Sequence, residues 1–133
     1  MKYDVEQCIG NRLRCLSRIL DNKFRIMLKD FNITESQLSI LFALSKLGKT
    51  EQGKIGEALF LERSTVSRNV KLLESRGILS RTDAYRPEIE ITKQGDVLLQ
   101  QILPIWESLM DGICNTLGEE GLYGLKTLEQ KLN

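Results

Sequence analysis

The sequence predicts a mainly α-helical protein of the α+β winged-helix class, with a winged helix-turn-helix flanked by N- and C-terminal dimerisation helices. Two observations support this fold class. Within residues 50–77, two short amphipathic segments are separated by only a few residues, which is the outline of a helix-turn-helix. Residues 78–82 and 88–91 then have the composition of β-strands around a turn at residues 83–87. A helix-turn-helix followed at once by a β-hairpin is a winged helix.

The chain is expected to begin with a long helix. Residues 5–29 carry apolar side chains at helical intervals, with basic residues between them. This segment exceeds the usual length of about 11 residues, so the helix is expected to pack against more than its own small domain. Thr34 and Gln37 have the spacing of a capping box and predict the start of a second helix. That helix should end near Gly48, because glycine tolerates a left-handed backbone.

The helix-turn-helix consists of the next two helices. We expect Thr50 to cap a third helix that ends near Leu59, and a fourth helix to run from about Arg63 to just before Gly77. The apolar residues of the fourth helix fall on one face. Small hydroxyls and long cations share its opposite face, namely Ser64, Arg68, Lys71 and Ser75. Such a face suits the major groove of DNA, where arginine reads guanine edges and lysine reaches phosphates. The alternative is an ordinary solvated helix face.

The C-terminal part of the chain should form two helices. Thr92 is expected to cap a fifth helix over residues 93–117, and Gly118 and Gly121 to bracket a break before a last helix over residues 122–131. The fifth helix is apolar on more than one stripe, so it must be buried on two sides. We therefore expect a dimer in which the terminal helices of two chains interlock. The alternative is packing of the terminal helices within one chain.

These assignments predict a single domain over residues 1–133. A chain of this length can bury a core without disulfides or a metal ion. The winged helix-turn-helix should occupy residues 34–92, and the helical dimerisation region residues 1–31 and 93–133.

The composition limits the function classes. The net charge is +1, but residues 46–86 carry nine Lys and Arg against five Asp and Glu, which fits a surface that neutralises phosphates. The chain has no histidine and no Gly-rich phosphate loop, and it has three cysteines, which argues against an enzyme, a metal site or a bound cofactor. No apolar stretch is long enough for a membrane span and the N-terminus lacks a signal peptide, so we expect a cytoplasmic protein with no membrane partner.

Three segments resemble one protein family. The stretches ERSTVSR (residues 62–68), LESRGIL (73–79) and IEITKQG (89–95) are similar to the recognition helix, the wing and the beginning of the long fifth helix in the MarR family of bacterial transcriptional regulators. The resemblance covers nearly the whole chain. It implies a homodimer, more a repressor than an activator, that binds a pseudo-palindromic operator in double-stranded DNA.

The resemblance also implies which residues meet the DNA. The expected contacts are Arg63, Ser64, Thr65, Ser67, Arg68, Lys71 and Arg86. The wing departs from the family pattern, because the family usually has a longer hairpin with adjacent arginines near its tip. Here two residues separate Asp83 from Arg86. We therefore expect a short wing, with Arg86 as its contact in the minor groove.

A small-molecule effector is implied where the winged helix meets the dimerisation helices. The candidate pocket residues are Phe24, Phe31, Trp106 and Met110. The alternative is that these residues pack in the core, as apolar residues at helical spacing usually do.

Two other hypotheses remain open. A thiol switch is one, since some members of the family sense oxidants through a cysteine in the first helix. Cys8 and Cys15 lie seven residues apart and share a helix face near several arginines, which favour a reactive thiolate. Against this, free cysteine is commonly buried and inert. The other hypothesis is a winged-helix module that uses its recognition face on a protein partner.

Overall fold

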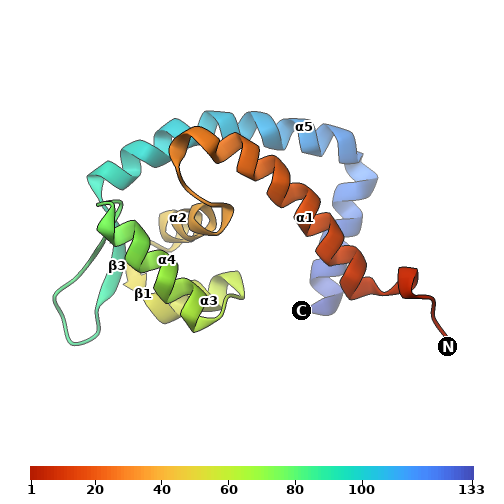
Figure 1. Ribbon diagram of the computed structural model, residues 1–133, viewed down its shortest axis with the longest axis horizontal. Coiled ribbons are helices and arrows are strands. Elements are labelled where there is room, and N and C mark those ends of the chain that lie inside the picture. The colour runs from red at the N-terminus through yellow and green to blue at the C-terminus, as the bar shows by residue number, and fades with distance from the viewer.

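The computed structural model describes residues 1–133 and places a winged helix beside two long helices, α1 and α5 (Figure 1). In chain order the elements are η1 (Val5–Gln7), α1 (Ile9–Leu28), η2 (Lys29–Phe31), α2 (Glu35–Leu47), β1 (Thr50–Glu51), α3 (Gln52–Leu59), α4 (Arg63–Ser75), β2 (Leu79–Arg81), β3 (Glu88–Ile91) and α5 (Lys93–Leu132). The predicted winged-helix class is confirmed, because α3 and α4 form the helix-turn-helix and β2 and β3 form the hairpin.

The first helix is shorter than predicted. Residues Val5–Gln7 form a separate 3-10 turn, and α1 begins at Ile9 because Cys8 has an extended backbone (φ −62°, ψ 110°). After α1 the chain tightens into the 3-10 turn η2, which ends at Asn32 in the left-handed conformation (φ 51°). The left-handed residue turns the chain sharply into α2, which lies beneath α1 in Figure 1.

The predicted limits of α2 are confirmed. The Thr34 hydroxyl accepts a hydrogen bond from the Gln37 backbone N–H, and the Gln37 side-chain oxygen accepts one from the Thr34 backbone N–H, both at 3.1 Å. This capping box satisfies two backbone donors that a helix start otherwise leaves free. At the other end, Gly48 has a positive φ of 73°, a region that favours glycine.

The prediction that Thr50 caps the third helix is wrong. Thr50 lies in β1, where it pairs with Ile89 of β3, and α3 starts only at Gln52 with no side-chain cap. Its backbone is used in the sheet rather than at a helix end, and the residue is only 8% exposed. The sheet therefore has three antiparallel strands in the order β1-β3-β2. The hairpin register pairs Leu79 with Ile91.

The predicted break between the last two helical segments is confirmed at Gly118. α5 is helical from Lys93 to Leu132 except at Gly118, whose φ of 67° and ψ of −178° produce a kink. Gly121 lies inside the following helical segment and marks no second break. Beyond the kink the chain turns back toward the N-terminal half of α1 (Figure 1). None of the helices has the length and apolar character that a membrane crossing requires.

The core lies within the winged helix. Its fully buried members include Leu41, Ile55, Val70, Leu73 and Ile89. The two long helices reach this core only near their inner ends, through Leu28 of α1 and Leu99 and Ile102 of α5. Large apolar side chains elsewhere on these helices stay exposed, among them Leu16, Ile19, Ile26, Leu117, Leu125, Leu128 and Leu132. The long helices thus carry apolar surface that one copy of the chain does not cover.

Candidate nucleic-acid interface

The turn between α3 and α4 is short because Gly56 lets the chain pack against α3. The backbone N–H of Leu61 donates to the Gly56 carbonyl at 3.0 Å. A Cβ atom on Gly56 would lie 3.2 Å from the Leu61 carbonyl oxygen and 3.5 Å from Val66. Phe60 makes the turn itself in the left-handed conformation (φ 55°), and the residue is 84% exposed. This geometry sets α4 at a fixed angle to α3.

The two faces of α4 differ as the sequence predicted. Val66, Val70 and Leu73 are buried against the core. Four of the predicted DNA contacts on α4 are exposed, namely Arg63, Ser64, Arg68 and Lys71, while Thr65 and Ser67 are half-buried. Ser75 is exposed, but its hydroxyl donates to the Leu72 carbonyl at 2.7 Å. The outward face therefore offers Arg68 and Lys71 as free cations near the middle of the helix.

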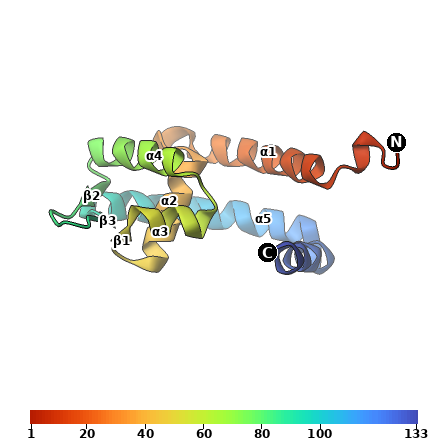
Figure 2. The same cartoon turned by 90° about the horizontal axis from the view of Figure 1, so that it is seen from below.

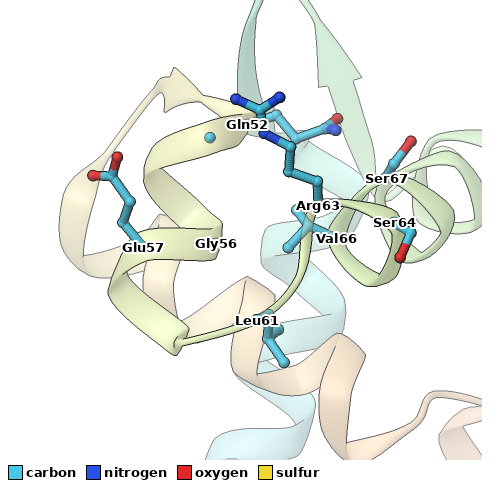
Figure 3. Close-up of a pocket in the computed structure, with 9 residues that line it drawn as sticks. Gln52, Gly56, Glu57, Leu61, Arg63, Ser64, Val66 and Ser67 are labelled. Atoms are coloured by element: carbon cyan, nitrogen blue, oxygen red, sulfur yellow. The ribbon is translucent and has the colours of Figure 1, made fainter.

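A hollow of about 660 Å³ lies between α3 and α4 beside this face. It is lined by Gln52, Gly53, Gly56, Glu57, Leu61, Arg63, Ser64, Val66 and Ser67. Figure 3 shows the Arg63 side chain extending from the start of α4 across the hollow toward the first turn of α3. Arg63 forms no salt bridge, since the single ion pair of the chain joins Arg81 to Glu74. Its guanidinium is thus available to an external anion.

A buried polar link holds the first turn of α4. The Gln37 side-chain amide donates to the Asn69 side-chain oxygen at 3.4 Å, and the Asn69 amide donates to the Thr65 carbonyl at 3.0 Å. Gln37 and Asn69 are only 7% and 8% exposed, so each needs these partners. The prediction from sequence missed Asn69. Its signal was a polar residue on the apolar face of α4, next to Val70.

A second link holds the last turn of α4. The guanidinium of Arg76 donates to the backbone carbonyls of Asn32 and Phe31, the latter at 3.2 Å. These carbonyls belong to the connection between α1 and α2. Arg76 therefore stabilises the fold and adds little to a DNA-facing surface. No local pattern indicates this role, because the partners of Arg76 lie more than forty positions away.

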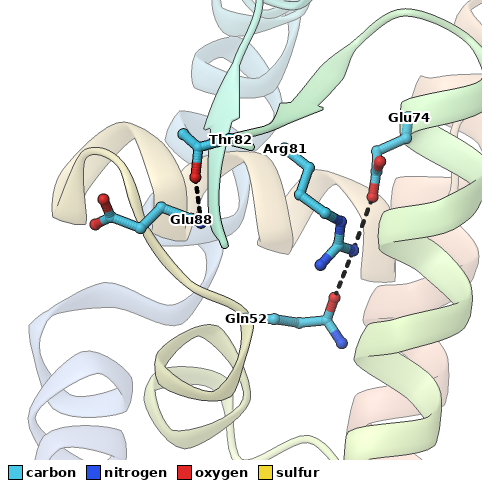
Figure 4. A network of polar contacts seen from close by, with 5 residues as sticks. All are labelled: Gln52, Glu74, Arg81, Thr82 and Glu88. Atoms are coloured by element: carbon cyan, nitrogen blue, oxygen red, sulfur yellow. Dashed lines mark hydrogen bonds and ion pairs between the residues drawn. The ribbon is translucent and has the colours of Figure 1, made fainter. Parts of the chain in front are cut away.

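The wing is fixed to the helix-turn-helix by Arg81. Its guanidinium donates to Glu74 of α4 at 2.9 Å and to Gln52 of α3 at 3.1 Å (Figure 4). Directly after Arg81, where the loop begins, the Thr82 N–H donates to the Glu88 carbonyl at 2.9 Å, and the Glu88 N–H donates to the Thr82 hydroxyl at 2.8 Å. These contacts make the wing one unit with α3 and α4.

The wing is short, as predicted. Its loop spans residues 83–87, in which Asp83, Tyr85 and Arg86 are exposed. Asp83 and Arg86 form no ion pair. The Arg86 guanidinium therefore stays free for a contact outside the chain.

The candidate effector residues lie around the junction of α1, α2 and α5. Phe31 and Trp106 pack against the core, and Trp106 meets Phe42 edge to face with ring centroids 4.9 Å apart. Phe24 and Met110 are half-buried. None of the four lines the large apolar hollow of about 890 Å³ between α1 and the outer half of α5. Sequence reasoning did not identify Phe42 or this hollow.

Only Cys15 of the two candidate redox cysteines lies in α1, because Cys8 precedes the helix with an extended backbone, so the expectation that they share a helix face is wrong. Cys8 and Cys15 are exposed, and both are free thiols. Cys114, on α5, is half-buried. No group of histidine, cysteine or carboxylate side chains in the chain has the geometry to hold a metal ion.

The fold and the exposed face of α4 define a winged helix-turn-helix DNA-binding protein. Residues 31–86, from the end of α1 to the wing, match the model of the MarR family. Over this segment the chain is similar to this family of transcriptional regulators, as its sequence suggested.

Known proteins extend the match over almost the whole chain. The organic hydroperoxide resistance transcriptional regulator of Bacillus subtilis (strain 168) is 28% identical over 142 residues, covering 98% of this chain and 95% of that protein. Bordetella bronchiseptica BpsR, whose DNA binding is regulated by 6-hydroxynicotinic acid, gives a TM-score of 0.87 at 20% identity, covering 99% and 98% of the two chains. The S. aureus MepR-DNA complex gives a TM-score of 0.82 at 24% identity, covering 97% and 96%. These structures share the fold of this chain.

Proposed function

We propose that the chain is a homodimeric repressor that binds a pseudo-palindromic operator with α4 in the major groove. The observation that carries the proposal is the face of α4, where Arg68 and Lys71 are exposed on a helix whose other side is buried and held at both ends. Arginine can bind the O6 and N7 atoms of guanine together, and lysine can reach a phosphate. Ser64, Thr65 and Ser67 are short enough to let the helix approach the base edges.

Removal of the Arg68 guanidinium tests this assignment. Arg68→Ala should weaken binding to the selected operator by about 1–3 kcal/mol and relax the preference for its bases. The operator is first selected from a random DNA pool with the wild-type protein, and binding is then measured by gel shift. Arg25→Ala is the matched control, because Arg25 is exposed on α1 and its guanidinium donates a hydrogen bond to the Asn22 side chain within the same helix. Equal binding by Arg68→Ala and wild type would remove Arg68 from the recognition surface.

The dimer is supported by the apolar hollow between α1 and the outer half of α5. Nine of its sixteen lining residues are hydrophobic, and leucines on both helices stay exposed around it. Soluble monomers rarely expose a contiguous apolar patch of more than a few hundred Å². A second copy covers this surface with the same surface, as a two-fold dimer requires. The two α4 helices then read half-sites about one helical turn apart.

A charge in this apolar surface should separate the two copies. Leu125 and Leu72 make a matched pair, because their side chains are 50% and 49% exposed, the first beside the hollow and the second on α4. We expect Leu125→Glu to sediment as a monomer in analytical ultracentrifugation with unchanged far-UV circular dichroism, and Leu72→Glu to stay dimeric. A dimeric Leu125→Glu would contradict this interface.

We further propose that a small effector controls DNA binding from the junction of Phe24, Phe31, Trp106 and Met110. The regulation of BpsR by 6-hydroxynicotinic acid supports a ligand of this general size in a protein of the same fold. Trp106 is the only tryptophan, so an aromatic acid bound beside it should change the protein fluorescence in a saturable way. The test titrates 6-hydroxynicotinic acid and related aromatic acids, with operator release measured in parallel. Release without a fluorescence change would place the effector elsewhere.

Thiol control is the second candidate for regulation. The exposure of Cys8 and Cys15 favours it, and so does the similarity to a regulator of organic hydroperoxide resistance. A hydroperoxide would oxidise a thiol to sulfenic acid and be reduced to the alcohol. Cumene hydroperoxide should then release the operator from wild type but not from the Cys8→Ser, Cys15→Ser double variant, and dithiothreitol should restore binding. Release from both proteins would exclude these cysteines.

A further inference from the structure

The tip of the wing carries one aromatic side chain that the fold does not use. The hairpin closes at Thr82 and Glu88 through two hydrogen bonds, which leaves a loop of residues 83–87 with Tyr85 at its centre. Tyr85 is 99% exposed, so its ring has almost no contact within the protein. Figures 1 and 2 show the loop projecting beyond α3 and α4. The loop therefore presents Tyr85 as its most prominent side chain.

The charges of the loop indicate what kind of contact this tip can make. Asp83 and Arg86 are both exposed and opposite in sign, so the loop carries no net charge. Its attraction to the phosphates is correspondingly weak. Tyrosine supplies an apolar ring and a polar hydroxyl, a combination that suits the sugar edge of a groove with phosphates along its rim. The minor groove is roughly 6 Å wide and is walled by deoxyribose, so a single ring can pack against that wall.

The anchoring of the wing supports an energetically useful contact. Arg81 holds the hairpin to α3 and α4 through Gln52 and Glu74, so the base of the loop that carries Tyr85 is fixed relative to the recognition helix before DNA binds. Little ordering of the loop base is then needed on binding, and a rigid contact loses less entropy. Since Tyr85 has no role in the folded core, its substitution leaves the protein stable.

We propose that Tyr85 is a DNA-contacting residue of the wing, whose ring packs against deoxyribose in the minor groove beside the half-site read by α4. The inference rests on the proposed operator binding. It assigns the wing of this chain two contacts. Tyr85 supplies an uncharged contact that buries sugar surface, and Arg86 supplies a separate charged contact.

The salt dependence of binding distinguishes the two contacts. The probe is a fluorescein-labelled duplex selected by the wild-type protein from a random pool, and affinity is measured by anisotropy over a series of KCl concentrations. Tyr85→Ala should lower affinity about five- to tenfold at every salt concentration. The slope of log affinity against log salt should stay that of wild type. Arg86→Ala should instead reduce the slope by about 0.9 for each phosphate that the guanidinium neutralises in the wild-type complex.

The matched variant is Tyr85→Phe, which keeps the ring and removes the hydroxyl. It should bind within about twofold of wild type, because the ring supplies the contact. Hydroxyl-radical cleavage of the duplex gives an independent readout, since this reagent attacks deoxyribose from the minor groove. Wild type and Tyr85→Phe should protect the flanking sugars, and Tyr85→Ala should lose that protection while keeping the protection within the half-sites.

Three outcomes would overturn the inference: wild-type affinity in Tyr85→Ala, a changed salt slope in Tyr85→Ala, or an equal decrease of affinity in the alanine and phenylalanine variants. Failure of the proposed function looks different. In that case the wild-type protein selects no duplex, or Arg68→Ala binds as well as wild type.

Discussion

Replacement of Gly95 by alanine should destabilise the fold by about 3 kcal/mol. Gly95 is buried in the first turn of α5. A Cβ atom there would lie 2.2 Å from the carbonyl oxygen of Ile78 and 2.9 Å from the Cγ2 atom of Ile91. Both distances are shorter than van der Waals contact. The start of α5 and the backbone at Ile78 must therefore separate by roughly 1 Å.

The Ile78 carbonyl is held where it is by two contacts from Thr92. The Thr92 backbone N–H donates to it at 3.0 Å, and the Thr92 hydroxyl lies 3.0 Å from it. The same hydroxyl caps α5 by accepting from the Gly95 N–H at 3.0 Å. Overpacking of this kind costs about 1–3 kcal/mol. Weakening the hydrogen bonds from Thr92 N–H to the Ile78 carbonyl and from Gly95 N–H to the Thr92 hydroxyl adds about 0.5 kcal/mol each. With an m-value near 2 kcal/mol/M, the midpoint of unfolding in urea should fall by roughly 1.5 M.

Gly53→Ala is the matched control, because a Cβ atom on Gly53 in α3 meets nothing within 4 Å. Alanine is up to about 1 kcal/mol more favourable than glycine in a helix, so this variant should not be destabilised. Urea unfolding is followed by the fluorescence of Trp106, the only tryptophan, at one protein concentration. A Gly95→Ala midpoint equal to that of wild type would refute the close approach of α5 to Ile78. An equal decrease of the urea midpoint in Gly53→Ala would show that the space around the Cβ position does not explain the effect.

Two further substitutions test other parts of the fold. Phe60→Gly should stabilise the protein by about 0.5–1 kcal/mol, because Phe60 has a left-handed backbone and an exposed ring. A lower melting temperature in a thermal scan would contradict this. Asn69→Ala should cost about 1–3 kcal/mol in urea unfolding, since the buried Gln37 amide then has no partner. Asn69→Asp, which keeps the acceptor oxygen but adds a buried charge, should also be unstable at neutral pH, and wild-type stability in both variants would show that the link contributes nothing.

The features that the sequence predicted correctly are local. The capping box at Thr34 and Gln37 joins residues three positions apart, and the two faces of α4 follow from the helical repeat alone. The strand β1 has only two residues and therefore no period to detect. It exists because Thr50 pairs with Ile89, thirty-nine positions later, and this long-range pairing overrode the local capping preference of threonine.

In the candidate site, too, the local features were predictable and the long-range contacts were not. The exposure of Arg68 and Lys71 was predictable from their spacing, but the contacts that hold α4 were not. Gln37 and Asn69 are 32 positions apart, and Arg76 lies 44 positions from Asn32. Nothing in the local sequence distinguishes the structural cation Arg76 from the free cation Arg68. The difference appears only when the fold brings the α1–α2 connection to the end of α4.

These long-range contacts also limit how a signal can reach the recognition helix. α4 is joined to the start of α2 through Asn69, to the α1–α2 connection through Arg76 and to the wing through the Glu74–Arg81 pair. The apolar hollow lies farther out, between α1 and the outer half of α5, and the winged-helix core contains only the inner ends of those helices. A change at the hollow therefore acts on the winged helix as one unit, because hydrogen bonds and an ion pair join its elements. We infer that such a change would reorient the whole winged helix rather than bend α4, and in the proposed dimer this motion would change the distance between the two α4 helices.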